Sequence, residues 1–121
     1  MLLDSVEAIP GVQAQIRSPV VSSPGCLELT FYYYLYGNSM TMELSVHILA
    51  GGSLGPALFT VKGNQGASWK PAEVRYQGTA DIQFVIVGTY GETALTDIAV
   101  DAVCVMACTG EMFLLSCSIV A

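Results

Sequence analysis

The sequence predicts an all-β domain, an antiparallel β-sandwich, and three observations lead to this fold class. Residues 27–36 alternate between apolar and more polar positions, which gives a strand one apolar face. Six further segments of strand length alternate or are apolar throughout, and Gly, Pro, Asn and Ser residues separate them. The sequence has no heptad pattern, no long amphipathic helix and no internal repeat. About seven short strands of this kind are typical of a jelly-roll or immunoglobulin-type sandwich.

The expected strands follow one another along the chain. After a short apolar start and a turn at residues 9–11, strands are expected over residues 12–17, 26–37, 42–49, 58–61, 69–76, 82–88 and 97–104. The second and third of these are predicted to pair as a hairpin through turn residues 37–39. Pro71 predicts an edge position for the 69–76 strand, because proline has no amide hydrogen to donate to a neighbouring strand.

Composition indicates a single small domain that normally has other protein or glycan around it. The chain has 121 residues, of which 53% are hydrophobic and only 12% are charged. Four basic residues are scattered among ten acidic ones, and the net charge of −6 disfavours nucleic acid and anionic membranes as partners. Residues 1–6 lack the features of a secretory signal peptide, and no apolar run approaches the roughly 20 residues that span a bilayer.

Few side chains are suited to catalysis. His47 is the only histidine and is expected on the exposed side of a strand, so a nucleophilic triad has no evident base. Asp97 and Asp101 lie four residues apart on one strand and share a face, which suits a hard cation such as calcium better than acid–base catalysis. The alternative is that Asp101 hydrogen-bonds a neighbouring turn. The sequence therefore predicts no enzyme and no required cofactor, and it places a candidate calcium site at Asp97 and Asp101.

Aromatic and cysteine residues leave several alternatives open. Trp69 is expected in the core between two sheets, with a surface binding anchor as the alternative. Tyr32, Tyr34 and Tyr36 lie on the more polar face of their strand, where they form a recognition face, a second buried layer or an interface within a larger protein. Four cysteines allow three complete pairings, and the pattern alone does not choose among them. They are Cys26, Cys104, Cys108 and Cys117.

Six segments, in order, resemble the MAM family. They are Ser18-Pro19; residues 26–37 followed by Leu44-x-Val46; Gly63-x-Gln65-Gly66-x-x-Trp69; Ile82-x-Phe84-x-x-x-Gly88; residues 97–101; and Cys108. The resemblance covers residues 1–108 as a partial MAM domain, and residues 109–121 form a tail outside the pattern. It implies a jelly-roll sandwich that is incomplete at its N-terminal side, because the family's first strands and first cysteine pair have no counterpart here.

The resemblance also implies a function. MAM domains are non-catalytic extracellular adhesive modules, so we expect an adhesion or recognition module at the cell surface, within a larger membrane protein. Its expected partners are a protein or glycoprotein ligand on a cell or in the matrix, neighbouring domains, and further copies of the chain. Several segments are most similar to repeats of a sperm adhesion protein, which implies binding to the egg coat. The alternative is an accessory or dimerisation domain of a secreted or membrane-bound enzyme such as a meprin-like protease.

The resemblance further implies a disulfide between Cys26 and Cys108. Such a bond would link residues 82 apart (108 − 26) and close nearly the whole sandwich. Cys104 and Cys117 would then be free, or paired with each other or with another chain. The family's usual second aspartate after Asp101 is replaced by Ala102, which speaks against the metal site.

Overall fold

The computed structural model describes residues 2–4, 13–21, 25–37, 42–78, 80–89, 96–108 and 116–118. These ranges contain strands and their connections only, and they include no helix that could cross a membrane. The turn expected at residues 9–11, residues 38–39 of the turn expected at 37–39, and most of the 109–121 tail lie outside the described residues.

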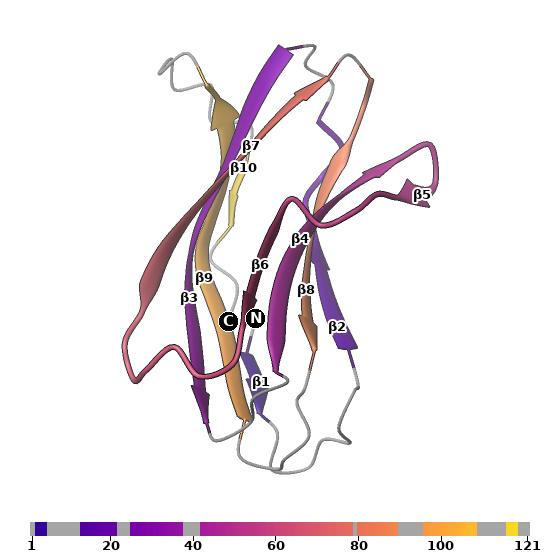
Figure 1. The fold of residues 1–121 in the computed structure, drawn as a ribbon. Coiled ribbons are helices and arrows are strands. Elements are labelled where there is room, and N and C mark those ends of the chain that lie inside the picture. The colour runs from indigo at the N-terminus through magenta and orange to yellow at the C-terminus, as the bar shows by residue number, and fades with distance from the viewer. Residues whose placement is uncertain are drawn as a thin grey trace.

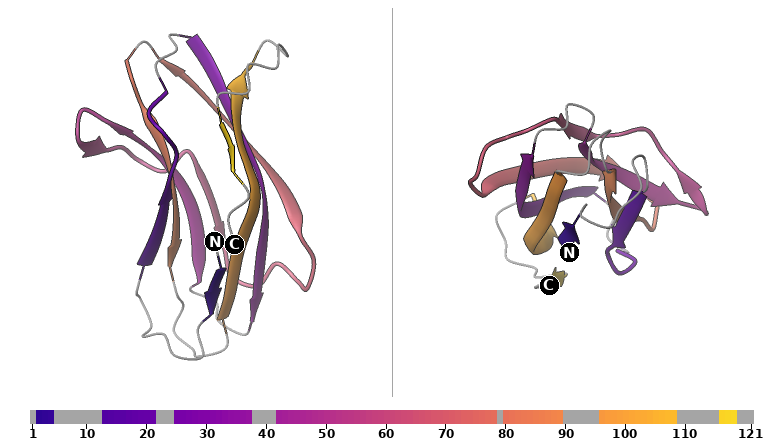
Figure 2. Two further views of the ribbon diagram at one scale, coloured as in Figure 1. Left: turned by 180° about the vertical axis from the view of Figure 1, so that it is seen from behind. Right: turned by 90° about the horizontal axis from the view of Figure 1, so that it is seen from below.

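Two antiparallel sheets pack face to face (Figure 1). Sheet A has the order β1 (Leu2–Asp4), β9 (Thr96–Ala107), β3 (Gly25–Gly37) and β7 (Lys70–Gly78), and β10 (Ser116–Ser118) also pairs with β9. Sheet B has the order β2 (Gln13–Arg17), β8 (Gln83–Thr89), β4 (Glu43–Ala50) and β5 (Ser53–Leu54), and β6 (Phe59–Lys62) also pairs with β4. Figure 2 shows the same two layers from behind, with the β4–β5 hairpin projecting beyond them. The predicted all-β sandwich is confirmed.

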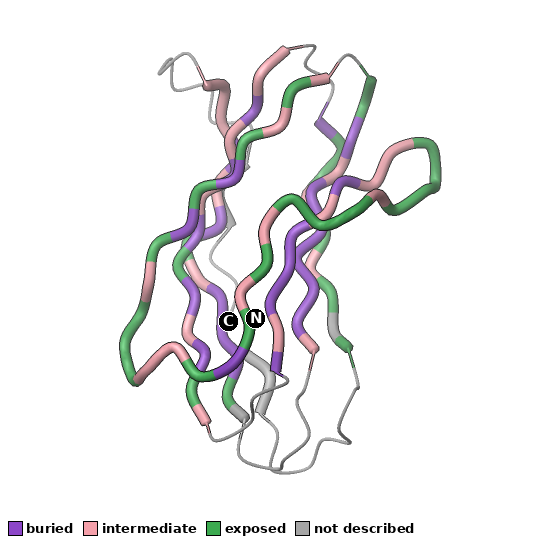
Figure 3. Tube along the Cα trace, in the orientation of Figure 1, coloured by how far each residue is buried: buried purple, intermediate pink, exposed green. Residues whose placement is uncertain are grey.

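The core lies between the inner faces of the two sheets (Figure 3). Every second residue of β3 is buried, and these residues contact the buried side of sheet B. From β3 they are Leu27, Leu29, Phe31, Tyr33 and Leu35, and from sheet B they include Leu44, Val46, Ile48, Phe84 and Ile86. Burial of apolar area on this scale is the main term that stabilises a small sandwich.

The predicted hairpin between residues 27–36 and 42–49 is wrong. β3 pairs with β7 and β9 in sheet A, whereas β4 pairs with β5, β6 and β8 in sheet B. The two consecutive strands therefore pack face to face across the core. An alternating pattern determines which face of a strand is apolar. The same pattern occurs whether two consecutive strands pair within one sheet or lie in two sheets that pack face to face, so alternation does not distinguish these arrangements.

In sheet A, β7 is an edge strand and β9 contains an irregularity. The edge position predicted from Pro71 is confirmed, since β7 is the last strand of its sheet. The register between β3 and β9 shifts between Thr30 and Tyr32, where β9 contains one extra residue. Ala102 lies at this bulge with a φ of 53°, the left-handed conformation that favours glycine.

A disulfide joins Cys26 at the start of β3 to Cys108, just after β9, as the resemblance implies. The Cα atoms of the two cysteines are 5.4 Å apart, and the Cys108 amide donates a hydrogen bond to the Cys26 carbonyl at 3.1 Å. Cys104 is also disulfide-bonded, so it is not a free thiol, and the residue opposite it on β10 is Cys117. The Cys26–Cys108 bond therefore anchors the two central strands of sheet A to each other at one end.

Candidate recognition surface

The outer face of sheet A presents a line of tyrosines. Alternation along β3 points Phe31, Tyr33 and Leu35 into the core, so the tyrosines between and beyond them point outward. Tyr32 is 50% exposed and Tyr36 is 44% exposed, while Tyr34 between them is half-buried. Exposed aromatic side chains that are held by a rigid strand are typical of binding surfaces.

Trp69 extends this line from the neighbouring strand. It precedes β7 by one residue and is 49% exposed, so the interpretation as a core tryptophan is wrong and the surface alternative fits. The ring centroids of Trp69 and Tyr34 are 5.7 Å apart, and those of Tyr34 and Tyr36 are 6.1 Å apart. We call Tyr32, Tyr34, Tyr36 and Trp69 the aromatic row. These contacts explain why Tyr34 is the least exposed of its three tyrosines.

Carboxylates lie beside both ends of the tyrosines. In the register of β3 with β9, Asp97 is opposite Tyr36 and Asp101 is opposite Tyr32. Asp97 is exposed and Asp101 is half-buried. Among the described outward positions of β3, β7 and β9, Arg75 is the sole basic residue. Its Nε donates to Glu28 at 2.8 Å, so the row has acidic neighbours while the cation on this face is already paired.

The two aspartates of the predicted metal site do lie on one face of β9. Four residues along a strand separate their Cα atoms by about 13 Å. Asp101 accepts a hydrogen bond from the Ala102 amide at 2.8 Å, the local contact noted as an alternative to metal binding. Within the described ranges, no three His, Cys, Asp or Glu side chains form a group that could hold a metal ion. Calcium at Asp97 and Asp101 stays a prediction.

His47 has a different environment from the one expected. It is half-buried on the outer face of sheet B, and both ring nitrogens have partners. Nδ1 lies 2.9 Å from the Gly55 carbonyl, which can only accept, so Nδ1 carries the proton. Nε2, 2.9 Å from Ser45 Oγ, then accepts the hydrogen bond from the hydroxyl. Ser45 is 6% exposed, and His47 contacts the Gly55 carbonyl in the position where a catalytic triad has a carboxylate. The two hydrogen bonds therefore link β4 to the segment after β5 and have a structural role.

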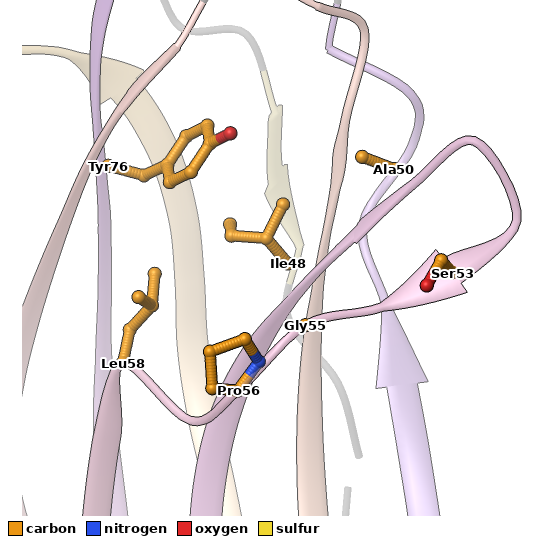
Figure 4. Close-up of a pocket in the computed structure, with 7 residues that line it drawn as sticks. All are labelled: Ile48, Ala50, Ser53, Gly55, Pro56, Leu58 and Tyr76. Atoms are coloured by element: carbon orange, nitrogen blue, oxygen red, sulfur yellow. The ribbon is translucent and has the colours of Figure 1, made fainter.

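An apolar pocket opens between the edges of the two sheets, with a volume of about 380 Å³. Figure 4 shows the ring of Tyr76, from β7, pointing toward Ile48, from β4. The other lining residues are Ala50, Ser53, Gly55, Pro56 and Leu58. The hydroxyls of Ser53 and Tyr76 are the polar side-chain groups of this lining, and none of the seven residues carries a charge, a thiol or an imidazole. The lining therefore supplies neither hydroxyl with a histidine, carboxylate or amine as a partner base.

Together, the sheets, the disulfide and the exposed row define a disulfide-linked β-sandwich module with an exposed aromatic face. The chain belongs to the MAM family: its residues 1–109 match the MAM domain, meprin/A5/mu. The extra strand β10, residues 116–118, lies beyond the matched residues.

Two curated relatives are similar to this chain over part of their own length. The chain is 40% identical to zonadhesin from Oryctolagus cuniculus over 114 residues, which cover 93% of this chain and 5% of that protein. It is 36% identical to neuropilin-1 from Xenopus laevis over 94 residues, which cover 75% of this chain and 10% of that protein. The chain thus spans a small part of the curated relatives that it matches.

A solved structure shares the fold at low identity. The K3 cleaved adhesin domain of Lys-gingipain from Porphyromonas gingivalis w83 superposes with a TM-score of 0.57 and 18% identity. The superposition covers 75% of this chain and 59% of that one. At this identity the likeness bears on the sandwich architecture alone.

Proposed function

We propose that this chain is a non-catalytic extracellular recognition module that mediates adhesion by binding a protein or glycoprotein ligand. The observation that carries the proposal is the aromatic row on the outer face of sheet A. Tyrosine and tryptophan are the residues that most often dominate binding energy at protein interfaces, because they bury large area and lose little conformational entropy. Here they are held in place by strands whose other faces form the core.

Family membership and the disulfide support the same proposal. Disulfides persist in oxidising compartments, which fits a module at the cell surface or outside the cell within a larger membrane protein. The similarity to zonadhesin favours adhesion between cells or to matrix, including the binding of sperm to the egg coat. Catalysis is disfavoured because the buried hydroxyl of Ser45 and the imidazole of His47 are engaged in structural contacts.

The mechanism that we propose is surface complementarity without conformational change. The aromatic row needs no rearrangement on binding, since the backbone of its three tyrosines lies in a paired sheet closed by Cys26–Cys108 and Trp69 directly precedes β7 of that sheet. A single small face gives modest affinity, and repetition of such modules in one protein would raise the avidity by two to four orders of magnitude, as a rough estimate.

The test is a bead-adhesion assay with the purified, oxidised chain. Beads coated with the chain are expected to bind cells or matrix, with the egg coat as one surface in the panel, and Trp69→Ala with Tyr32→Ser should reduce binding several-fold. The matched control is Leu58→Ala, because Leu58 is similarly exposed, at 44%, but lies away from sheet A's outer face. Absence of binding to every surface tested, from folded protein, would contradict the proposal.

A further inference from the structure

We propose that the aromatic row recognises a cationic segment of a partner protein, in which arginine side chains stack on the rings and pair with Asp97 and Asp101. This inference rests on the adhesion function proposed above and names the chemistry of the ligand at the same face. Three features of that face support it: a continuous aromatic surface, carboxylates beside both ends, and an acidic chain whose nearest outward cation is already paired.

Three of the four rings of the row, those of Tyr34, Tyr36 and Trp69, form a continuous surface rather than isolated side chains. Tyr34 lies within 6.1 Å of Tyr36 and within 5.7 Å of Trp69, measured between ring centroids. The face of an aromatic ring attracts a cation placed over it, and tryptophan and tyrosine are the best partners for this contact. The planar guanidinium of arginine also stacks on such faces and is more weakly hydrated than an ammonium group.

The carboxylates beside the row favour a ligand that carries positive charge. Asp97 lies beside Tyr36 and Asp101 beside Tyr32, so each end of the tyrosines offers an acceptor for a guanidinium. Asp101 already accepts the Ala102 amide, but a carboxylate has about four acceptor positions and can bind further donors. The roughly 13 Å between the two aspartates matches two arginines at positions i and i+4 of an extended peptide.

The wider charge pattern points the same way. The chain carries ten acidic and four basic residues, and Arg75, the basic side chain at an outward position of β7, pairs with Glu28. A cationic ligand would therefore meet attraction along the row and from the net charge of the chain. A neutral glycan also stacks on aromatic rings, but it gains no charge pairing from Asp97 or Asp101, so the row fits it less well.

Trp69 makes a direct measurement available. It is the single tryptophan of the chain, so fluorescence excited at wavelengths that tyrosine does not absorb reports on the aromatic row. The probe is the peptide Gly-Ser-Arg-Ser-Gly-Ser-Arg-Ser-Gly, titrated into the oxidised, folded chain at low ionic strength. We expect a saturable fluorescence change whose affinity falls as salt is raised. The same peptide with glutamates in place of both arginines should leave the fluorescence unchanged, and cellohexaose is titrated in parallel as a neutral glycan.

Charge-removing variants locate the contact. Asp97→Asn combined with Asp101→Asn is expected to weaken binding of the arginine peptide about three- to tenfold. An asparagine at position 101 keeps an oxygen that can accept the Ala102 amide, which preserves the local fold. The control is Asp81→Asn, which removes one negative charge, half of what the double variant removes, from an exposed position between β7 and β8. That control should bind as the parent does, and thermal melting checks that all three proteins are folded.

The outcomes separate this inference from the adhesion function. Affinity unchanged in the double variant, insensitivity to salt, no saturable response to the arginine peptide, or saturation by cellohexaose alone would overturn the cationic ligand. If coated beads still bind cells under those results, adhesion stands and only the ligand chemistry is wrong. If the beads bind no surface while the peptide saturates in a row-dependent manner, the cationic site stands and the adhesion function is wrong.

Discussion

The two faces of β3 use the same residue types for opposite purposes. Tyr33, on the inner face, is 8% exposed and packs edge-on against Phe59 at 6.0 Å between ring centroids. Tyr32, its neighbour on the outer face, is 50% exposed. The difference comes from the alternation of the strand and not from the residue, so position along β3 decides whether an aromatic side chain stabilises the fold or remains available for a ligand.

The largest change in the free energy of unfolding should come from removing the disulfide, which gives a position on the outer face a role in stability. Cys26 lies on the outer face of β3, yet its bond to Cys108 closes a loop of 82 residues. Replacing both cysteines with alanine is expected to lower the free energy of unfolding by about 4–5 kcal/mol by chain-entropy estimates. Urea unfolding of the double variant and the parent measures it. A loss below about 1 kcal/mol would show that the bond constrains little of the unfolded chain.

The inner and outer faces are compared most directly by matched aromatic truncations. Phe31→Ala removes a ring that is 2% exposed and should cost about 3–5 kcal/mol through lost burial and a cavity. Tyr32→Ala, one residue away, should change the free energy of unfolding by no more than about 0.5 kcal/mol. Equal losses in thermal or urea unfolding would contradict the division between a core face and a binding face.

The outer face of sheet B differs from that of sheet A, because the polar groups of Ser45 and His47 are hydrogen-bonded within the fold. His47→Ala leaves the buried Ser45 hydroxyl and the Gly55 carbonyl without their partner, and it should cost about 1–3 kcal/mol. Thr60→Ala is the control, since Thr60 lies opposite Ser45 on β6 but is exposed. Stability that falls equally in both variants would show that the network contributes nothing of its own.

Local patterns predicted the strands better than their partners. The seven expected strands correspond to β2, β3, β4, β6, β7, β8 and β9, because each has a periodicity of two or an apolar run that local sequence displays. The two-residue strand β5 falls between the strands expected at residues 42–49 and 58–61, and it has no periodicity to detect. The pairing of β3 with β9 was not predicted, because the two strands are far apart in sequence and alternation carries no information about partners.

The candidate surface was predictable only in part for the same reason. The outward direction of Tyr32, Tyr34 and Tyr36 follows from alternation in β3. Their proximity to Asp97 and Asp101 depends on the β3–β9 register, which local sequence does not show. The exposure of Trp69 had one available signal: it has the same parity as Pro71, two residues on, and opposite parity to the buried Ala72 and Val74.

The smallest expected effect concerns the bulge that sets the register of the outer face. Ala102 is exposed and adopts a φ of 53°, so its Cβ adds strain and fills no space in the core. Ala102→Gly should remove that strain, partly offset by the greater freedom of glycine in the unfolded chain, for a net gain of up to about 1 kcal/mol. Ala57→Gly is the control: Ala57 is also exposed but has no positive φ, so glycine there should lower stability slightly. In urea unfolding, the free energy of unfolding is expected to rise in Ala102→Gly and to fall in Ala57→Gly. A loss of stability in both variants would show that Ala102 is not strained.

The bulge separates the Thr30–Cys104 pair from the Tyr32–Asp101 pair. The Ala102→Gly variant should therefore keep the register of Tyr32 with Asp101 and with it the affinity for the arginine peptide. The strain at Ala102 would then bear on stability and not on binding.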